Sequence, residues 1–94
     1  MRPGFEWDED KAKANLRKHG ISFDEATTVF LDPFSATVTD PDHSTGEQRY
    51  VDVGSSERDR VLVVVYTERS ARIRIISCRK ATPAERKAYE EGHK

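Results

Sequence analysis

The sequence predicts an α+β domain in which a mainly antiparallel sheet carries two N-terminal helices on one face and is followed by a C-terminal helix. Three observations predict this fold class. Two capped helical segments fill the first third of the chain, four strand-like segments follow them, and one capped helix ends the chain. With a short strand at the start, the element order is β-α-α-β-β-β-β-α, in which strands joined by turns pair antiparallel and bury one face under helices.

The first helix is expected between Asp8 and Gly20, after a short strand that begins at Phe5. Asp8 is a good N-cap residue, and two acidic residues follow it in the first turn, where the helix dipole favours negative charge. Basic residues 17–19 occupy the last turn, and Gly20 suits the left-handed position that ends a helix.

The second helix is expected to begin at Ser22, immediately after that corner. Glu25 stands three residues later, so the pair predicts a capping box in which each side chain binds the backbone of the other residue. Asp32-Pro33 ends this helix, because the residue before a proline disfavours helical geometry.

Four strands are expected in the rest of the sheet. Phe34–Thr39 and Arg49–Val53 alternate between apolar and polar residues and are rich in β-branched side chains. Arg60–Thr67 is a nearly continuous apolar run, which indicates a central strand covered on both faces. A short turn then leads to Arg72–Arg79, which is expected to pair with it as an antiparallel hairpin.

The last expected strand contains an irregularity. Strict alternation puts Arg72 and Arg74 on one face and Arg79 on the other, with the isoleucines. The doublet Ile75-Ile76 departs from this pattern and indicates either a β-bulge or a strand covered on both faces. The face on which Arg79 lies depends on which of the two is present.

The last helix is expected from Thr82 to about Gly92. Thr82 and Glu85 have the spacing of a capping box, and Pro83 stands at the first helical position, where its missing N–H costs nothing.

Length and composition restrict the class of protein. The 94 residues suffice for one domain, spanning residues 1–94, with one modest core. The chain has no apolar run long enough to cross a membrane and no signal-peptide region at its start, so we expect a cytoplasmic protein that does not bind membranes. Its single cysteine, Cys78, predicts neither an internal disulfide nor a zinc site.

Charge is unevenly distributed along the chain. The formal net charge is only −1, which argues against a globally basic nucleic-acid-binding protein. Residues 1–47 carry 5 basic and 10 acidic side chains (5 − 10 = −5), whereas residues 48–94 carry 11 and 7 (11 − 7 = +4). Eight of the ten arginines lie in the second half. They are either a solvated sheet face or a local anion site, since a guanidinium binds phosphate through two parallel hydrogen bonds.

Several motifs occur in the order found in one family of bacterial toxins. From residue 5 to about residue 90 the chain resembles the BrnT family, which belongs to the RelE-like class of type II toxin–antitoxin systems. One departure is Cys78, where the family more often has a small residue; a thiol that points into the core would be a nearly neutral exchange. The motifs that carry the resemblance are F-E-W-D, K-H-G-I-S-F-D-E-A, F-x-D-P, D-x-x-H-S, E-x-R, V-V-Y-T-E-R and R-I-I-S-C-R-K-A-T.

The resemblance implies a metal-independent endoribonuclease without cofactors that arrests growth by cleaving RNA. A BrnA-like antitoxin would neutralise the toxin in a hetero-oligomer and bring it to operator DNA. Without a metal ion, attack of a ribose 2′-OH on the adjacent phosphate requires a general base, a proton donor for the leaving oxygen, and cations that offset the developing charge. The acidic residues 8–10 spread around a helix start, so they predict a cap rather than a metal site.

The first expected helix supplies three candidate residues. His19 is a candidate acid or base, since imidazole groups ordinarily titrate near neutral pH, although helical spacing also fits a buried corner residue. Lys18 and Lys11 are candidate phosphate-binding residues on one side of the helix, and ordinary helix surface is the alternative. His43, in a polar loop, is a second possible base, or simply solvated.

The sheet supplies the other candidates. Glu47 and Arg49 project to the same side of an extended segment, either as part of the site or as a surface ion pair. Tyr66 is a candidate to stack on a base or donate a proton, or else belongs to the rim of the core. Three further arginines of the last hairpin are candidates to hold phosphate: Arg69, Arg74 and Arg79.

The working hypothesis places Lys18 and His19 at a cleft shared with Glu47, Arg49, Arg69 and Arg79. Lys11, Arg74 and Tyr66 would bind the substrate there. Two other classes of protein remain open: a catalytically inactive partner of a DNA-binding antitoxin, and a small nucleic-acid-binding module.

Overall fold

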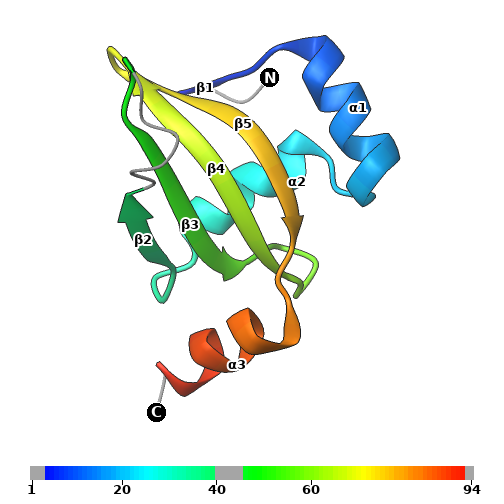
Figure 1. Cartoon of the computed structure of the whole chain (residues 1–94), viewed down its shortest axis with the longest axis vertical. Helices are drawn as coiled ribbons and strands as arrows, with labels where there is room; N and C mark the ends of the chain where they lie inside the picture. Colours follow the sequence, from blue (N-terminus) through cyan, green and yellow to red (C-terminus); the bar gives the residue numbers. More distant parts are fainter. Residues whose placement is uncertain (1–3, 40–45, 93–94) are drawn as a thin grey trace.

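The computed structural model describes residues 4–39 and 46–92. The order of helices and strands confirms the predicted one, with a short 3-10 turn added after the second helix (Figure 1). None of the helices within these two ranges is long and apolar enough to cross a membrane. In chain order the elements are β1 (Phe5–Glu6), α1 (Glu9–His19), α2 (Phe23–Thr28), η1 (Val29–Leu31), β2 (Ala36–Thr39), β3 (Arg49–Ser55), β4 (Val61–Arg69), β5 (Arg72–Lys80) and α3 (Pro83–Glu91).

The five strands form one sheet in the order β1-β5-β4-β3-β2. β1 pairs parallel with β5, and every other pair is antiparallel, as predicted for a mainly antiparallel sheet. The apolar strand β4 lies at the centre, between β3 and β5, because its run of valines suits a strand that is covered on both sides.

Most of the predicted helix caps are present. Asp8 accepts hydrogen bonds from the N–H groups of Asp10 (2.8 Å) and Lys11 (3.1 Å), and Gly20 has φ 71°, the left-handed conformation that ends α1. The capping box of α3 is complete. At α2 only half of the expected box is found: Ser22 accepts from the Glu25 N–H at 3.0 Å, while the Glu25 carboxylate binds groups beyond the helix.

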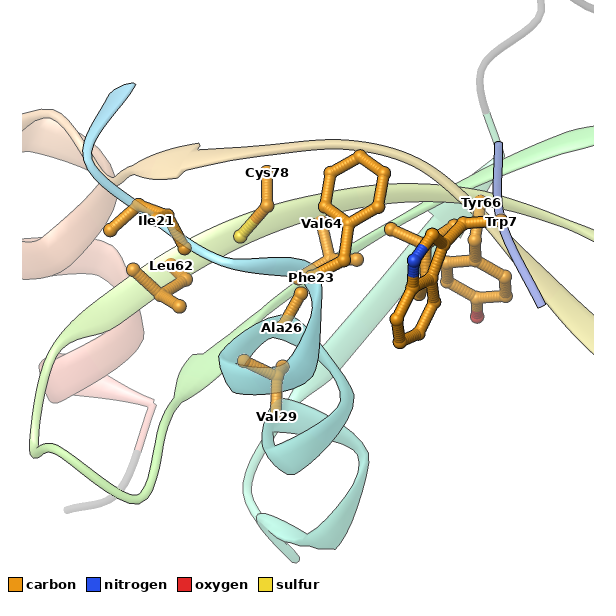
Figure 2. Close-up of a cluster of buried hydrophobic side chains, with 10 residues drawn as sticks. Trp7, Ile21, Phe23, Ala26, Val29, Leu62, Val64, Tyr66 and Cys78 are labelled. Atoms are coloured by element: carbon orange, nitrogen blue, oxygen red, sulfur yellow. The ribbon is translucent and has the colours of Figure 1, made fainter. Parts of the chain in front are cut away.

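The core lies between the sheet and α2, with the α1–α2 corner closing one end (Figure 2). Phe23 and Val29 from the α2–η1 segment belong to one buried cluster with Leu62 and Val64 of β4. Cys78 of β5 also points into this core, and burial raises the pKa of its thiol to about 12. The thiol is therefore an inert packing group, as expected for a nearly neutral exchange.

A β-bulge in β5 decides which side chains share a face. Tyr66 pairs with Ile75 and Val65 pairs with Ser77, so Ile76 is the extra residue. The bulge, one of the two predicted alternatives, brings Arg79 opposite Val63. Arg79 therefore lies on the face of the sheet that is opposite to α2, not with the core isoleucine as strict alternation suggests. We call the face opposite to α2 the open face.

Candidate active site

A basic pocket of about 170 Å³ lies at one end of the open face. It joins the first turn of α1 to the residues around β3, β4 and β5, segments that are far apart in the sequence. We call it the basic pocket; its lining residues are Lys11, Glu47, Arg49, Thr67, Arg69, Arg74 and Ile76.

Strand register brings the central residues of this pocket together. Thr67 of β4 pairs with Arg49 of β3 on one side and with Arg74 of β5 on the other. Directly paired residues of neighbouring strands project to the same face, so the two guanidinium groups flank the threonine. Arg69 lies two residues further along β4 and extends from the same face.

The helix α1 brings Lys11 to the basic pocket because Asn15 fixes the helix against β5. The buried Asn15 amide donates hydrogen bonds to the carbonyl oxygens of Cys78 (2.9 Å) and Ile21 (3.0 Å), and its oxygen accepts from the Cys78 N–H at 3.1 Å. Lys11 precedes Asn15 by four residues and so lies on the same side of the helix. This helix side therefore faces the edge of the sheet, and Lys11 reaches the pocket.

Cations outnumber carboxylates in the pocket. Arg69 binds Glu47 through two hydrogen bonds, of 2.9 and 3.2 Å, and these hold the pKa of the Glu47 carboxyl below its ordinary value. Arg74 donates to Glu6 of β1 at 2.9 Å. Four cationic side chains thus surround one lining carboxylate, which is an arrangement suited to binding an anion.

Thr67 is the buried polar group of this pocket. Its side chain is only 2% exposed, and its Oγ1 has no hydrogen-bond partner within residues 4–39 and 46–92. No local pattern in the sequence distinguishes Thr67, because its importance depends on the register that places it between two arginines. The apolar Ile76, which the bulge turns toward the pocket, was missed for the same reason.

The pocket brings five of the candidate residues together: Lys11, Glu47, Arg49, Arg69 and Arg74. Lys18 and His19 do not line it. They follow Lys11 by seven and eight residues, which corresponds to about 10–12 Å along a helix axis. Lys18 and His19 therefore lie outside this pocket, and the first turn of α1 supplies its lysine.

Two further candidates have other environments. Tyr66 is buried on the helix-covered face, stacks on Tyr50 with ring centroids 5.5 Å apart, and donates to Asp52 at 2.9 Å. Burial raises the pKa of its phenol, and the structure places Tyr66 in the core and outside the basic pocket. The candidate base His43 lies outside the described residues.

Arg79 shares the open face but not the pocket. Five residues separate it from Arg74 along β5, or about 16 Å in an extended strand. Its guanidinium binds Glu85 of α3 through hydrogen bonds of 2.7 and 3.0 Å. Together with the capping N–H of Thr82, this contact lowers the pKa of Glu85 to about 2 and ties the start of α3 to β5.

We expect the Glu85 carboxyl to titrate near pH 2 in the folded protein. Because its folded pKa lies below the ordinary value of 4.5, the contact stabilises the docked α3 above about pH 4.5 and is lost as the pH falls toward 2. Carbonyl chemical shifts in an NMR titration measure this midpoint. Replacing Arg79 by glutamine should move it upward toward 4.5, and an unchanged midpoint would contradict this origin of the shift.

Among residues 4–39 and 46–92, no group of three His, Cys, Asp or Glu side chains has the arrangement of a metal site. The polar groups that line the basic pocket are guanidinium, ammonium, hydroxyl and one carboxylate group.

The chain is similar to known proteins both in sequence and in fold. Residues 7–85 match a family described as ribonuclease toxin, BrnT, of type II toxin–antitoxin systems. The 1.1 Å crystal structure of the ribonuclease toxin BrnT from Brucella abortus is similar in fold. The two share 24% sequence identity with a TM-score of 0.61, covering 81% of this chain and 92% of that one. No curated protein sequence matches the chain.

Proposed function

Because this chain belongs to the BrnT family of ribonuclease toxins of type II toxin–antitoxin systems, we propose that it cleaves RNA in the basic pocket without a metal ion. The observation that carries this proposal is the convergence of Lys11, Arg49, Arg69 and Arg74 with the Glu47 carboxylate. A phosphodiester that enters the pocket meets cations contributed by α1 and three strands. These charges favour the transition state, in which negative charge accumulates on the phosphate oxygens.

The proposed reaction is an internal attack on the phosphate. Glu47 accepts the proton of the ribose 2′-OH, the 2′ oxygen forms a bond to phosphorus, and the bond to the 5′ oxygen breaks. Lys11 supplies the proton to the departing 5′ oxygen, since a guanidinium group does not deprotonate in proteins whereas an ammonium group does. The products are a 2′,3′-cyclic phosphate and a free 5′-hydroxyl.

Glu47 fits the role of base through its charge state. Its lowered pKa keeps the carboxylate ionised at neutral pH, so it does not already carry a proton when RNA binds. The same lowering makes it a weak base, and catalysis therefore relies mainly on the surrounding positive charge and on the position of the 2′-OH.

A toxin of a type II system has a protein antitoxin as its partner. We propose that this partner is a BrnA-like protein that blocks access of RNA to the open face and brings the complex to operator DNA. The complex of this chain with its antitoxin would be a hetero-oligomer.

Substitution of Lys11 by alanine should lower the rate of RNA cleavage by at least 10²-fold, the typical contribution of a positioned proton donor. Lys18 is the matched control, since it lies on the same helix outside the pocket and its replacement should leave the rate within about twofold. The rates are measured with purified protein and RNA in the presence of EDTA.

A substrate with 2′-deoxyribose at the cleaved link should not react. Equal loss of activity in the Lys11 and Lys18 variants would argue against this pocket. Complete loss of cleavage in EDTA, restored by a divalent cation, would argue against the metal-independent mechanism. A chain that never cleaves RNA yet binds it would favour a catalytically inactive partner.

A further inference from the structure

We infer that the Thr67 hydroxyl is a phosphate-binding group, which donates a hydrogen bond to a non-bridging oxygen of an RNA phosphate in the basic pocket. This inference rests on the proposed function and adds a positioning residue to it. It predicts that the threonine contributes to substrate binding, while its hydroxyl contributes nothing favourable to the folded state without substrate.

The first observation is the missing hydrogen bond. Buried hydroxyl groups are nearly always paired, because removing one from water without a partner is unfavourable. The other buried threonines follow this rule: Thr27 donates to the Asp24 carbonyl at 2.6 Å and Thr28 donates to the Glu25 carbonyl at 2.7 Å. Thr67 differs from them, since its Oγ1 has no partner in the described part of the chain.

The second observation is the chemistry of its neighbours. Thr67 is paired across the sheet with Arg49 and Arg74, and Lys11 and Arg69 line the same pocket. All four of these side chains are hydrogen-bond donors that have no acceptor atoms. The hydroxyl therefore lies among donors and lacks an acceptor.

The carboxylates near the pocket already accept hydrogen bonds from arginines. The two Glu47 oxygens accept from Arg69, and Glu6 accepts from Arg74. An added oxyanion with several acceptor oxygens would satisfy the hydroxyl and neutralise the neighbouring guanidinium groups together. A tetrahedral phosphate has this property, whether it belongs to RNA or is free in solution.

The pocket that Thr67 lines is bordered by exposed side chains. Arg69 and Glu47, whose side chains are 49% and 43% exposed, form a solvent-screened pair above the strand surface. Exposed pairs of this kind contribute little to stability, so a phosphate can replace the Glu47 carboxylate on Arg69. Such an exchange would also release Glu47 to accept a proton.

The test compares two variants of Thr67, one without the hydroxyl group and one with it. Thr67→Val keeps the shape of the side chain and removes the hydroxyl, whereas Thr67→Ser keeps the hydroxyl. The probes are inorganic phosphate and a dinucleotide with 2′-deoxyribose at the cleaved link, and the affinities are obtained from NMR titrations. Thr67→Val should bind the dinucleotide about tenfold more weakly, and Thr67→Ser should bind it nearly as the wild type does.

A second measurement separates binding from folding. Without phosphate, Thr67→Val should unfold at the same temperature as the wild type or higher, because it removes a buried group without a partner. Thr39→Val, at an exposed threonine of β2 outside the pocket, is the control and should leave both affinities unchanged. Weaker binding together with a lower unfolding temperature in Thr67→Val would indicate a structural role and overturn the inference.

The outcomes also separate this inference from the proposed function. If the wild type cleaves RNA while Thr67→Val binds the dinucleotide as tightly as the wild type, the inference is wrong and the nuclease proposal stands. If Thr67→Val loses affinity for the dinucleotide while the wild type cleaves no RNA, the phosphate contact stands without the nuclease. A loss confined to free phosphate would overturn the assignment to RNA.

Discussion

Replacing Arg60 by methionine should destabilise the fold by about 3 kcal/mol at neutral pH, because it leaves the carboxylate of Glu25 buried without its cation. The Glu25 side chain is only 4% exposed. Arg60 binds both of its oxygens, with the Nε contact at 2.9 Å, and Ser56 donates a further hydrogen bond at 2.7 Å. These contacts tie the start of α2 to the segment before β4.

The pH dependence of stability should change sign in this variant. In the wild type the hydrogen bonds from Arg60 lower the pKa of Glu25, so its contribution is present above about pH 4.5 and lost as the pH falls through the folded pKa. Without Arg60, burial dominates and raises the folded pKa. The variant should therefore gain stability relative to the wild type as the pH is lowered from 7 to 5.

Urea unfolding of four proteins measures these effects: the wild type, Arg60→Met, Glu25→Gln and the double variant. Glu25→Gln removes the charge, so the double variant should be more stable than Arg60→Met alone. A cost below about 0.5 kcal/mol for Arg60→Met, with no change in pH dependence, would show that the carboxylate is solvated in solution. The pair would then be an ordinary surface contact.

Local signals in the sequence were sufficient to predict the helices and to predict which face of most strands is buried. The bounds of α1 and α3 follow from cap residues within a few positions of each end, and these interactions need no knowledge of the rest of the chain. The same signals were ambiguous at α2. Glu25 has the spacing of a capping residue, but a partner 35 positions later binds its carboxylate.

The location of the site depended on contacts that no local pattern contains. Asn15 stands one helical turn from both Lys11 and Lys18, and its amide binds Cys78, 63 positions away. This contact decides which lysine reaches the sheet. Tyr66 fitted both a substrate contact and a core residue, and the register with Tyr50 decided in favour of the core. Contacts between residues far apart in the sequence therefore determine where these side chains lie, and local sequence patterns do not.

Replacing Glu47 by glutamine should have the largest effect on activity among single changes in the pocket. If Glu47 accepts the proton of the 2′-OH, its loss should lower the cleavage rate by about 10²–10⁴-fold, the usual contribution of a general base. The amide keeps the size of the side chain and one acceptor oxygen for Arg69. Since the side chain is exposed, the fold should be unaffected.

The pH dependence of the cleavage rate of the wild type should reflect the ionisation of Glu47. Because the hydrogen bonds from Arg69 lower the pKa of Glu47, cleavage should remain independent of this group from neutral pH down to below its ordinary value of 4.5. Replacing Arg69 by glutamine should shift this acid limb to higher pH, since the carboxylate loses the cation that keeps it ionised. Both are measured as kcat/KM on one RNA substrate, because this ratio reports the ionisation of the free protein, in which Arg69 binds Glu47.

The paired variants separate a base from a mere partner of Arg69. If Glu47 only holds the guanidinium in place, Glu47→Gln and Arg69→Gln should slow cleavage alike, and the acid limb should persist in Glu47→Gln. If Glu47 is the base, the limb should vanish with the carboxylate and move with Arg69→Gln. An acid limb that is unchanged in both variants would assign the proton transfer to a group outside the basic pocket.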